Sequence, residues 1–313
     1  MKIAFLNKYQ NKVARGAETF VYELSRRLSK NHKVEVISEI NYLDLLKNKD
    51  DLIIPTNGRW QVVITRMITW LNGSKMIVSG QSGIGWDDKV NILAMPDLFI
   101  ALTDKAKKWA RKFNPLVQVE KIPNGVDLEK FRPEGESYKT NLKKPIVLAV
   151  GAFTEQKRLD LAIKAVSKLK NVSLLLVGGG GELKERLESE GKRLLGKRFQ
   201  MLSIPFSEMP KVYRSADAFT LPSASSEAFG NVYVEAMASG LPIVATSDEQ
   251  RREIVGKAGI LMDPTNIEEY SEALQKALHT NWGSMPRKQA EKFSWETIAK
   301  KYEELFKTLL NKN

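Results

Sequence analysis

The chain has 313 residues, of which 42% are hydrophobic and 27% charged, and it contains no cysteine. This composition is typical of a folded globular protein and excludes a disordered chain, disulfide bonds, thiolate catalysis and cysteine metal sites. No apolar run approaches the ~20 residues of a membrane-spanning helix, and the residues from Met1 to Asn7 read as a strand rather than a signal peptide. We therefore expect a cytoplasmic protein.

The net charge of +12 is concentrated in the first half of the chain. Residues 1–144 hold 25 Lys and Arg against 16 Asp and Glu, whereas residues 145–313 hold 24 against 21. Such an excess could attract an anionic membrane surface, nucleic acid or a phosphorylated substrate, or it could be an ordinary solvated surface. No aromatic-rich RNA motif, zinc finger or basic heptad array accompanies it, so we expect no nucleic-acid partner.

Short apolar runs alternate with amphipathic stretches in the first half, which is typical of βαβ units on a parallel sheet. A helix is predicted from Ala17 onward, because Phe20, Val21, Leu24 and Leu28 recur at helical spacing, and a basic helix is predicted over Asp104–Phe113. The predicted strands are Ile3–Asn7, Val34–Ile37, Leu52–Pro55, Met76–Ser79, Leu98–Leu102 and Val117–Ile122.

A polar stretch without periodicity, Glu129–Lys144, predicts a domain boundary, after which the alternation restarts. Helices are predicted over Leu159–Leu169 and, at the end, Trp295–Leu310. The predicted strands are Ile146–Val150, Val172–Val177, Gln200–Ile204, Ala218–Leu221, Ile243–Ala245 and Ile260–Met262. Two such domains would hold a ligand between them, at the carboxyl ends of the strands.

The most informative segment follows the strand Ala218–Leu221. A loop of small residues leads to a helix that is predicted to start near Asn231, whose side chain could cap it. Loop amides and a helix N-terminus suit negative charge or sugar hydroxyls. Glu227 lies in the loop and Glu235 about one turn inside the helix, so the two carboxylates could reach different parts of one elongated ligand. The alternative is that Glu235 is an exposed helix residue.

The segment from Ser226 to Thr246, with two glutamates separated by seven residues, resembles the donor-site signature of glycosyltransferase family 4. The resemblance covers most of residues 145–265. It implies a retaining, nucleotide-sugar-dependent enzyme of α/β class with the GT-B fold, in which two Rossmann-like parallel-sheet domains face each other across a cleft. The acceptor-side domain would comprise residues 1–140 together with a C-terminal helix at 295–313, and the donor-binding domain residues 141–294.

The resemblance also implies roles for the residues of this segment. Glu227 would bond hydroxyls of the donor sugar, and Glu235 would bond the ribose hydroxyls of the nucleotide. The backbone amides of Phe229, Gly230 and Asn231 would face the sugar or the diphosphate.

A second element, Gly151–Arg158, follows the strand Ile146–Val150. A glycine at a strand end followed by a cationic pair suits a diphosphate, whose charge must be neutralised as it departs. Family members commonly carry an arginine just after this glycine and a lysine five residues later. Lys157 stands near the place of the lysine, but Ala152 stands where the arginine is common. Arg158 is therefore either a substitute or an ordinary surface residue.

Two further loops are expected near the nucleotide. The glycine-rich run Val177–Glu182 is a strand-to-helix turn rather than a dinucleotide fingerprint, because the glycine spacing and the downstream acid of that fingerprint are not clear. Gly178 would approach the nucleotide there, and Phe206 would neighbour the base.

The first half resembles the family more loosely. Arg15 and Gly16 stand in the family's paired-glycine loop, where Arg15 replaces the first glycine; a capped helix start is the alternative. Gln81 stands where many members carry a histidine, and it could orient an acceptor hydroxyl. His32 and His279 lie near predicted helix ends, so a histidine base is not expected. Retaining enzymes of this fold are thought to let the leaving phosphate assist the acceptor.

No metal is expected, because Lys157 and helix N-termini can stabilise a diphosphate. Asp87 and Asp88 are expected to be solvated acids at a helix start, and Asn124–Gly125 to form a turn with positive φ.

The sequence thus predicts a hexosyltransferase-type enzyme that uses a UDP- or GDP-type sugar donor and no other cofactor. Its acceptor would be a glycan, a lipid-linked sugar or a polysaccharide precursor, and the basic first half could contact an anionic inner membrane face. The alternative, suggested by Arg15, Ala152 and Gln81, is a catalytically degenerate scaffold that binds a sugar nucleotide or a glycan. A Rossmann dehydrogenase is disfavoured by the glycine spacing.

Overall fold

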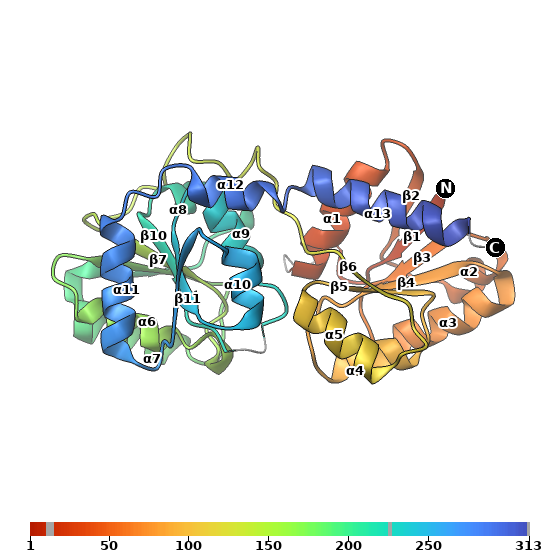
Figure 1. The fold of residues 1–313 in the computed structure, drawn as a ribbon, viewed down its shortest axis with the longest axis horizontal. Helices are drawn as coiled ribbons and strands as arrows, with labels where there is room; N and C mark the ends of the chain where they lie inside the picture. Colours follow the sequence, from red (N-terminus) through yellow and green to blue (C-terminus); the bar gives the residue numbers. More distant parts are fainter. Residues whose placement is uncertain (11–15, 225–226, 312–313) are drawn as a thin grey trace. The chain divides into compact units, whose positions relative to one another are not determined.

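The computed structural model describes residues 1–10, 16–224 and 227–311, and it divides into two compact units (Figure 1). Unit 1 comprises Met1–Gly125 and Trp295–Asn313, and unit 2 comprises Val126–Ser294. Each unit is built on a six-stranded sheet in which all neighbouring strands are parallel. Two of the residues considered above, Arg15 and Ser226, lie outside the described residues.

The sheet of unit 1 has the strand order β2-β1-β3-β4-β5-β6. Its central strands are buried on both faces, as is typical of parallel sheets that are covered by helices. The strands are β1 (Lys2–Leu6), β2 (Lys33–Ile37), β3 (Leu52–Pro55), β4 (Lys75–Ser79), β5 (Leu98–Ala101) and β6 (Val119–Lys121). The helices are α1 (Gly16–Leu28), α2 (Tyr42–Lys47), α3 (Trp60–Asn72), α4 (Trp86–Leu93), α5 (Asp104–Phe113) and α13 (Trp295–Leu310).

The two faces of this sheet carry different helices. Alternate residues such as Ile3 and Ile77 point to one face, where α1 and α13 pack, and Phe20 of α1 lies against Tyr302 of α13 with ring centroids 5.8 Å apart. Residues of the opposite parity, such as Met76 and Phe99, point to the other face. The core of that face takes one residue from each of three helices, α3, α4 and α5, and Figure 1 shows these helices together below the sheet.

The sheet of unit 2 has the order β12-β11-β10-β7-β8-β9. Its strands are β7 (Ile146–Val150), β8 (Ser173–Val177), β9 (Phe199–Leu202), β10 (Ala218–Leu221), β11 (Ile243–Thr246) and β12 (Gly259–Met262). The α-helices are α6 (Leu159–Ser167), α7 (Lys184–Leu195), α8 (Met209–Arg214), α9 (Asn231–Ala238), α10 (Glu249–Val255), α11 (Ile267–His279) and α12 (Met285–Glu291). Three short 3₁₀ helices are η1 (Glu155–Lys157), η2 (Gly196–Arg198) and η3 (Phe206–Glu208).

The stretch expected to be an interdomain linker, Glu129–Lys144, belongs to unit 2. Phe131 is buried against Tyr213, and Arg287 donates to the carbonyls of Leu128 and Phe131. Further along, the Tyr138 amide donates to the Lys211 carbonyl. These contacts place the start of unit 2 at Val126, ahead of the boundary expected after residue 140. Apart from the Phe131 side chain, these anchors are backbone groups, which leave no mark in the sequence, and the stretch therefore resembles a linker.

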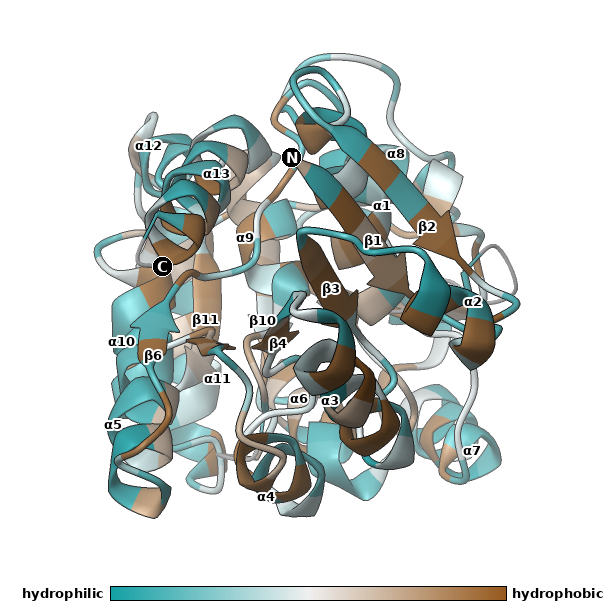
Figure 2. Ribbon diagram, turned by 90° about the vertical axis from the view of Figure 1, so that its right-hand side faces the viewer, coloured by the Kyte–Doolittle hydropathy of each residue, from teal (hydrophilic) through white to brown (hydrophobic). Residues whose placement is uncertain are grey.

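No helix of the described ranges is long and apolar enough to cross a bilayer. The hydropathy colouring of Figure 2 shows strongly apolar residues along β1 and β3, and also along the helices α3 and α4.

Candidate functional site

The strongest concentration of predicted site residues lies at the carboxyl ends of β7 and β10. These strands are neighbours, and the strand order runs one way from β7 and the other way from β10. The loops after them therefore diverge, and such a switch point is where open α/β sheets bind their ligands. The loop after β7 carries Gly151 and Lys157, and the loop after β10 carries Glu227.

Lys157 and Glu227 meet directly at this edge. The Lys157 Nζ lies 2.5 Å from the Glu227 Oε2, and the two side chains are 17% and 13% exposed. Gly151 flanks the pair, since a Cβ at that position would lie 3.4 Å from the Lys157 Cγ. An ammonium group has three N–H donors, so Lys157 can hold Glu227 and still bind another anion.

Two arginines hold the loop after β10 in place. Arg158, which has a left-handed backbone with φ of 48°, donates to the carbonyls of Pro222 and Ser223 at 2.7 and 3.1 Å and to the Thr246 hydroxyl. Its guanidinium thus anchors the loop and does not stand free as a surface residue. The second anchor, Arg251, was not found from the sequence.

Arg251 is fully buried and joins four groups. It donates to the Ser223 hydroxyl at 2.6 Å, to the Ala224 carbonyl at 2.9 Å and to the Tyr233 hydroxyl, and it forms an ion pair with Asp248. The Ala224 amide in turn donates to the Gln156 carbonyl of η1. Arg251 therefore connects the segment that precedes Glu227 to the segment that carries Lys157.

The helix α9 begins at Asn231, as the sequence predicts, but its cap differs from the expected one. Gly230 is the N-cap with φ of 85°, and no side chain caps the helix, so Asn231 is the first helical residue rather than the cap. A Cβ on Gly230 would lie 2.6 Å from the Tyr233 ring, so only glycine fits here. Phe229 is buried against Phe293, and only its backbone is available to a ligand.

Glu235 lies in the second turn of α9 and is 8% exposed, which rules out the exposed-residue alternative. The Tyr213 hydroxyl donates to its Oε2 at 2.8 Å. Burial raises the pKa of Glu235 to about 7, opposed by the Tyr213 hydrogen bond and by the charge of Lys130. A carboxyl so placed titrates near neutrality and can accept hydrogen bonds from hydroxyls once it ionises.

Tyr213, which donates to Glu235, also packs in an aromatic cluster. Phe131 packs on Tyr213 and on Phe206, with ring centroids 5.7 and 6.0 Å apart. The Lys130 Nζ lies 4.2 Å from the Phe206 ring centroid. Phe206 is thus connected to Glu235 through Phe131 and Tyr213. Lys130, which lies in the stretch expected to be a linker, adds a cation to this cluster. The only sequence signal was the aromatic Phe131 within a polar stretch.

Gly178 lies at the end of β8, beside the loop after β7. A Cβ there would lie 2.3 Å from the Gly151 carbonyl oxygen and 2.7 Å from the Phe153 ring. Close packing of the two loops therefore requires glycine at this position. Gly178 thus joins Gly151 and Lys157 at the same edge of the sheet.

Gln81 and Gly16 belong to unit 1. Gly16 is the exposed first residue of α1. The Gln81 amide forms a reciprocal pair with the Asn124 amide at 2.9 and 3.0 Å, and it also donates to the Ser79 hydroxyl. Gly125 does not have the positive φ expected of a turn. It is glycine because a Cβ would lie 2.4 Å from the Trp295 ring.

The two aspartates at the start of α4 differ from each other. Asp87 forms an ion pair with Arg59 at 2.5 Å, but Asp88 is buried rather than solvated. Burial raises the pKa of Asp88 to about 7, the Asn91 hydrogen bond opposes this rise, and the charge of Asp87 adds to it. The buried Asp88 lies beside Gly80, where a Cβ would be 2.8 Å from its Oδ2.

The two histidines lie away from these residues, and the part of the chain that is described holds no cluster of three His, Asp or Glu side chains suited to a metal ion. The His32 ring lies 3.1 Å from the Glu303 carboxylate, and the His279 ring lies 2.7 Å from the Gln275 carbonyl.

Residues 131–296 match the sequence profile of the family described as Glycosyl transferases group 1. The sulfoquinovosyl transferase SQD2 of Arabidopsis thaliana is 31% identical over an alignment of 200 residues that covers 56% of this chain and 37% of that protein. A phosphatidyl-myo-inositol mannosyltransferase of Mycobacterium tuberculosis is 30% identical over 178 residues, 54% of this chain and 46% of that protein. A GDP-mannose-dependent mannosyltransferase of Mycolicibacterium smegmatis, which acts on phosphatidylinositol monomannoside, is 28% identical over 190 residues, 53% of this chain and 49% of that protein. These matches span less than half the length of each relative.

Solved structures that resemble the whole chain include HepE and a sucrose-phosphate synthase. HepE of Anabaena, in complex with UDP and glucose, has a TM-score of 0.81 at 18% identity and covers 98% of this chain and 100% of its own. Sucrose-phosphate synthase of Thermosynechococcus elongatus has a TM-score of 0.81 at 19% identity and covers 99% of both chains. At this identity the likeness shows the fold.

Proposed function

Because this chain belongs to the glycosyl transferases group 1 family and has the GT-B fold, we propose that it transfers a sugar from a nucleotide diphosphate donor to an acceptor hydroxyl with retention of anomeric configuration. The observation that carries the proposal is the Lys157–Glu227 pair at the switch point of unit 2, with the buried Glu235 on the helix that follows. These three side chains suit three parts of one ligand: Glu227 would bind the sugar, Lys157 the diphosphate and Glu235 the ribose.

In this proposal the bond between the anomeric carbon and the β-phosphate oxygen breaks as the acceptor oxygen bonds to the same face of that carbon. The acceptor proton passes to the departing phosphate oxygen. Lys157 and the amides at the start of α9 stabilise the negative charge that develops on the diphosphate. Glu227 bonds sugar hydroxyls while keeping Lys157 in place, and no metal ion is needed.

Glu235 would accept hydrogen bonds from the ribose hydroxyls. The Tyr213 hydroxyl occupies its Oε2, whereas no described residue occupies its Oε1. Lys130 and Phe206 would neighbour the base, and Gly178 would let the backbone approach the nucleotide. The anchoring bonds of Arg158 favour a role in holding the loop after β10, rather than as the substitute cation expected from the sequence.

We propose a UDP- or GDP-type donor, as the names of HepE's ligand and of the mycobacterial relative suggest. A lipid-linked acceptor is supported by the phosphatidylinositol named for the relatives and by the basic first half, which suits an anionic membrane face. Gln81 of unit 1 would orient the acceptor hydroxyl. Gly16, also of unit 1, would lie near the donor phosphate and the acceptor. The cytoplasmic location expected from the sequence remains part of this proposal.

The test starts with the nucleotide. Purified protein is titrated with UDP, GDP and ADP while the melting temperature is followed, because a ligand of the native state at 100 times its Kd adds about 2.7 kcal/mol of stability. One nucleotide should raise the melting temperature of the wild type. Glu235→Ala should abolish this rise, and the matched control Glu272→Ala, on an exposed residue of α11, should keep it.

Activity is then measured as slow hydrolysis of the matching sugar nucleotide without acceptor. Hydrolysis that disappears in Lys157→Ala supports a transferase. Nucleotide binding with no hydrolysis and no transfer to any acceptor would instead identify the catalytically degenerate scaffold. No rise in melting temperature with any of the three nucleotides would refute the donor site itself.

A further inference from the structure

The helices α3 and α4 expose a set of large apolar side chains that unit 1 does not use. Trp60 is 77% exposed, Trp86 is 72% exposed and Trp70 is 65% exposed. Met67, Leu71 and Leu93 are also exposed. We call these six residues the α3–α4 face. Single exposed apolar residues are ordinary, but a set of this size on two helices that line one pocket marks a surface that meets a partner.

The pattern along α3 explains why the face exists. Val62 and Ile68 point into the core of unit 1, whereas Trp60, Met67 and Trp70 lie on the outer side at helical spacing. The helix is therefore apolar on two sides, although the sheet covers only one. A helix that is apolar on both sides has a second apolar surface to bury.

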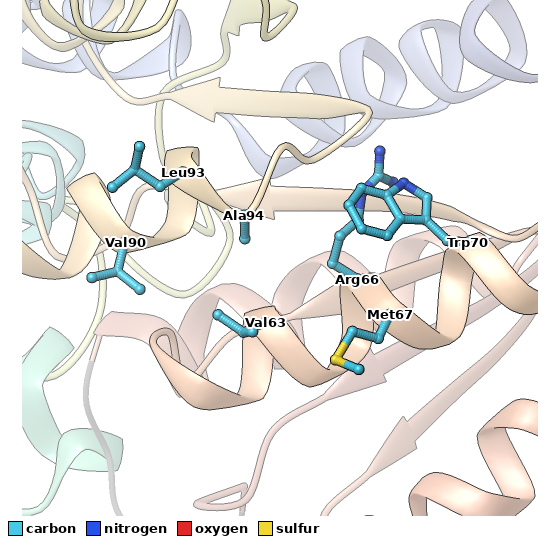
Figure 3. Close-up of a pocket in the computed structure, with 7 residues that line it drawn as sticks. All are labelled: Val63, Arg66, Met67, Trp70, Val90, Leu93 and Ala94. Atoms are coloured by element: carbon cyan, nitrogen blue, oxygen red, sulfur yellow. The ribbon is translucent and has the colours of Figure 1, made fainter.

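A pocket of about 300 Å³ lies between the two helices at this face (Figure 3). Arg66 stands over the Trp70 ring at 4.9 Å from its centroid, and its Nη1 pairs with Asp97 at 2.6 Å. The pocket is otherwise lined by apolar side chains, from α3 by Val63, Met67 and Trp70, and by Val90 and Leu93 of α4 together with Ala94, which caps the end of α4.

The charges around the face favour a negatively charged partner. Arg59 neutralises Asp87, Arg66 neutralises Asp97, and Asp88 is buried. The acids near the face are therefore compensated. The neighbouring helix α5, which packs on the same side of the sheet, carries five cationic residues and one acid: Lys105, Lys107, Lys108, Arg111, Lys112 and Asp104. Lys107 and Arg111 both pair with Glu120, and Asp104 pairs with Lys121, so the helix and its ion-pair partners keep a net positive charge.

We propose that the α3–α4 face, flanked by α5, is the surface through which this chain docks on an anionic lipid bilayer. Tryptophan side chains favour the boundary between headgroups and acyl chains, and lysines beside them are attracted to anionic headgroups. A second copy of the chain fits less well, because a two-fold contact through this face would bring the two α5 helices, with like charge, toward each other. This inference deepens the membrane contact proposed above by naming its surface, and it does not depend on the donor chemistry.

The test is sedimentation of the full chain with vesicles, without nucleotide. Wild type should bind vesicles of 70% phosphatidylcholine and 30% phosphatidylglycerol far more than pure phosphatidylcholine, and added salt should weaken binding. The double variant Trp60→Ser/Trp70→Ser should lower the partition coefficient by roughly tenfold or more. The control is Tyr22→Ser. Like Trp70, Tyr22 is an exposed aromatic residue with an arginine, Arg26, over its ring, but it lies on α1, on the opposite face of the sheet.

The contribution of charge is tested by Lys89→Glu/Lys112→Glu, two exposed residues of α4 and α5. This variant should lose binding to anionic vesicles by about tenfold or more, whereas Lys184→Glu/Lys197→Glu, exposed residues of unit 2, should not. All four variants should keep the nucleotide-induced rise in melting temperature, so failure of the donor site would be seen separately.

Three results would overturn the inference. Wild type that ignores anionic vesicles at low salt removes the membrane contact altogether. Binding that survives the tryptophan and lysine variants moves the contact to another surface. A wild-type dimer in sedimentation velocity that Trp70→Ser dissociates assigns the face to a second copy of the chain.

Discussion

The carboxyl edges of the two sheets can be compared directly, because both sheets have six parallel strands. In unit 2 the edge carries the Lys157–Glu227 ion pair, and the loop after β10 is held by Arg158 and Arg251. In unit 1 the corresponding edge carries the neutral amide pair of Gln81 and Asn124. A departing diphosphate requires a fixed cation such as Lys157, whereas an acceptor hydroxyl can be oriented by neutral donors and acceptors such as those of Gln81. The contrast therefore suggests which ligand part each edge is suited to bind.

Each unit also contains one buried carboxyl whose pKa is raised to about 7, Glu235 in unit 2 and Asp88 in unit 1. Burial is the main cause in both. The surroundings differ, because Glu235 has the Tyr213 hydroxyl and the charge of Lys130, which both favour its ionised form. For Asp88 the Asn91 hydrogen bond favours the ionised form, but the negative charge of Asp87 opposes it. Glu235 is therefore the carboxyl prepared to ionise when hydroxyl donors arrive.

The largest effect is expected on the free energy of unfolding, when the side chains that hold the loops at each sheet edge are removed. Arg251→Ala should lower the free energy of unfolding of unit 2 by about 3–5 kcal/mol, because it removes the counter-charge of Asp248 and, in a buried setting, the guanidinium donors to Ser223 and Tyr233. Gln81→Ala should cost only about 1 kcal/mol, as expected for neutral hydrogen bonds. Urea denaturation curves of both variants measure the difference, and equal losses would remove the contrast between the edges.

The next effect concerns turnover. Lys157→Ala should lower turnover of the sugar nucleotide by about 10²–10³-fold, the range found when one group that stabilises a developing negative charge is removed. Lys164→Ala serves as the control, since this lysine pairs with Asp160 on the exposed side of α6. Turnover that is unchanged in Lys157→Ala would show that the Lys157–Glu227 pair is only structural.

A smaller effect is expected on nucleotide affinity. Glu235→Gln keeps the shape of the side chain but removes its negative charge, so the Kd for the preferred nucleotide should rise by roughly 10–100-fold. Asp88→Asn makes the same change in the buried carboxyl of unit 1 and should leave this Kd unchanged. Calorimetric titration of both variants decides whether the two carboxyls differ as described.

The smallest effect is the pH dependence of that affinity. Below its pKa of about 7, Glu235 is protonated and its capacity to accept hydrogen bonds falls, so the wild-type Kd should improve by up to about tenfold between pH 6 and pH 8. Glu235→Gln should be flat across this range. The free energy of unfolding should instead decrease as the pH rises toward 7. The raised pKa means that the native state binds the Glu235 proton more tightly than the unfolded state does, so loss of this proton costs stability.

Much of this fold can be predicted from the sequence. The predicted bounds of β3, α5, β7, β10 and α13 agree with the structure, because each has a clear apolar period or run. The helix α3 was not predicted, since its apolar residues on two sides, such as Val62 and Trp70, leave no single period. The GT-B fold and the family were correctly inferred from the segment around Glu227 and Glu235.

The partners of these site residues could not be predicted in the same way. Tyr213, Lys130 and Arg251 are distant in sequence from Glu235, Phe206 and Ser223, which they respectively contact, and each is an ordinary residue in its own segment. Only the fold brings them together. The assignment of Asp88 to solvent was wrong for the same reason, because burial by Gly80 and Phe99 depends on strands β4 and β5.

The position of α13 has a consequence for how the protein is made. Trp295, Tyr302 and Phe306 complete the core of unit 1 against α1, yet they follow all of unit 2 in the chain. Unit 2 is a continuous polypeptide, so it can fold on the ribosome as soon as Ser294 has emerged. The first 125 residues of unit 1 are synthesised earlier. Their core, which includes Phe20 and Leu24, is complete only when α13 has been synthesised and packs against α1. We therefore expect unit 2 to complete its fold before unit 1, although most of unit 1 is synthesised first.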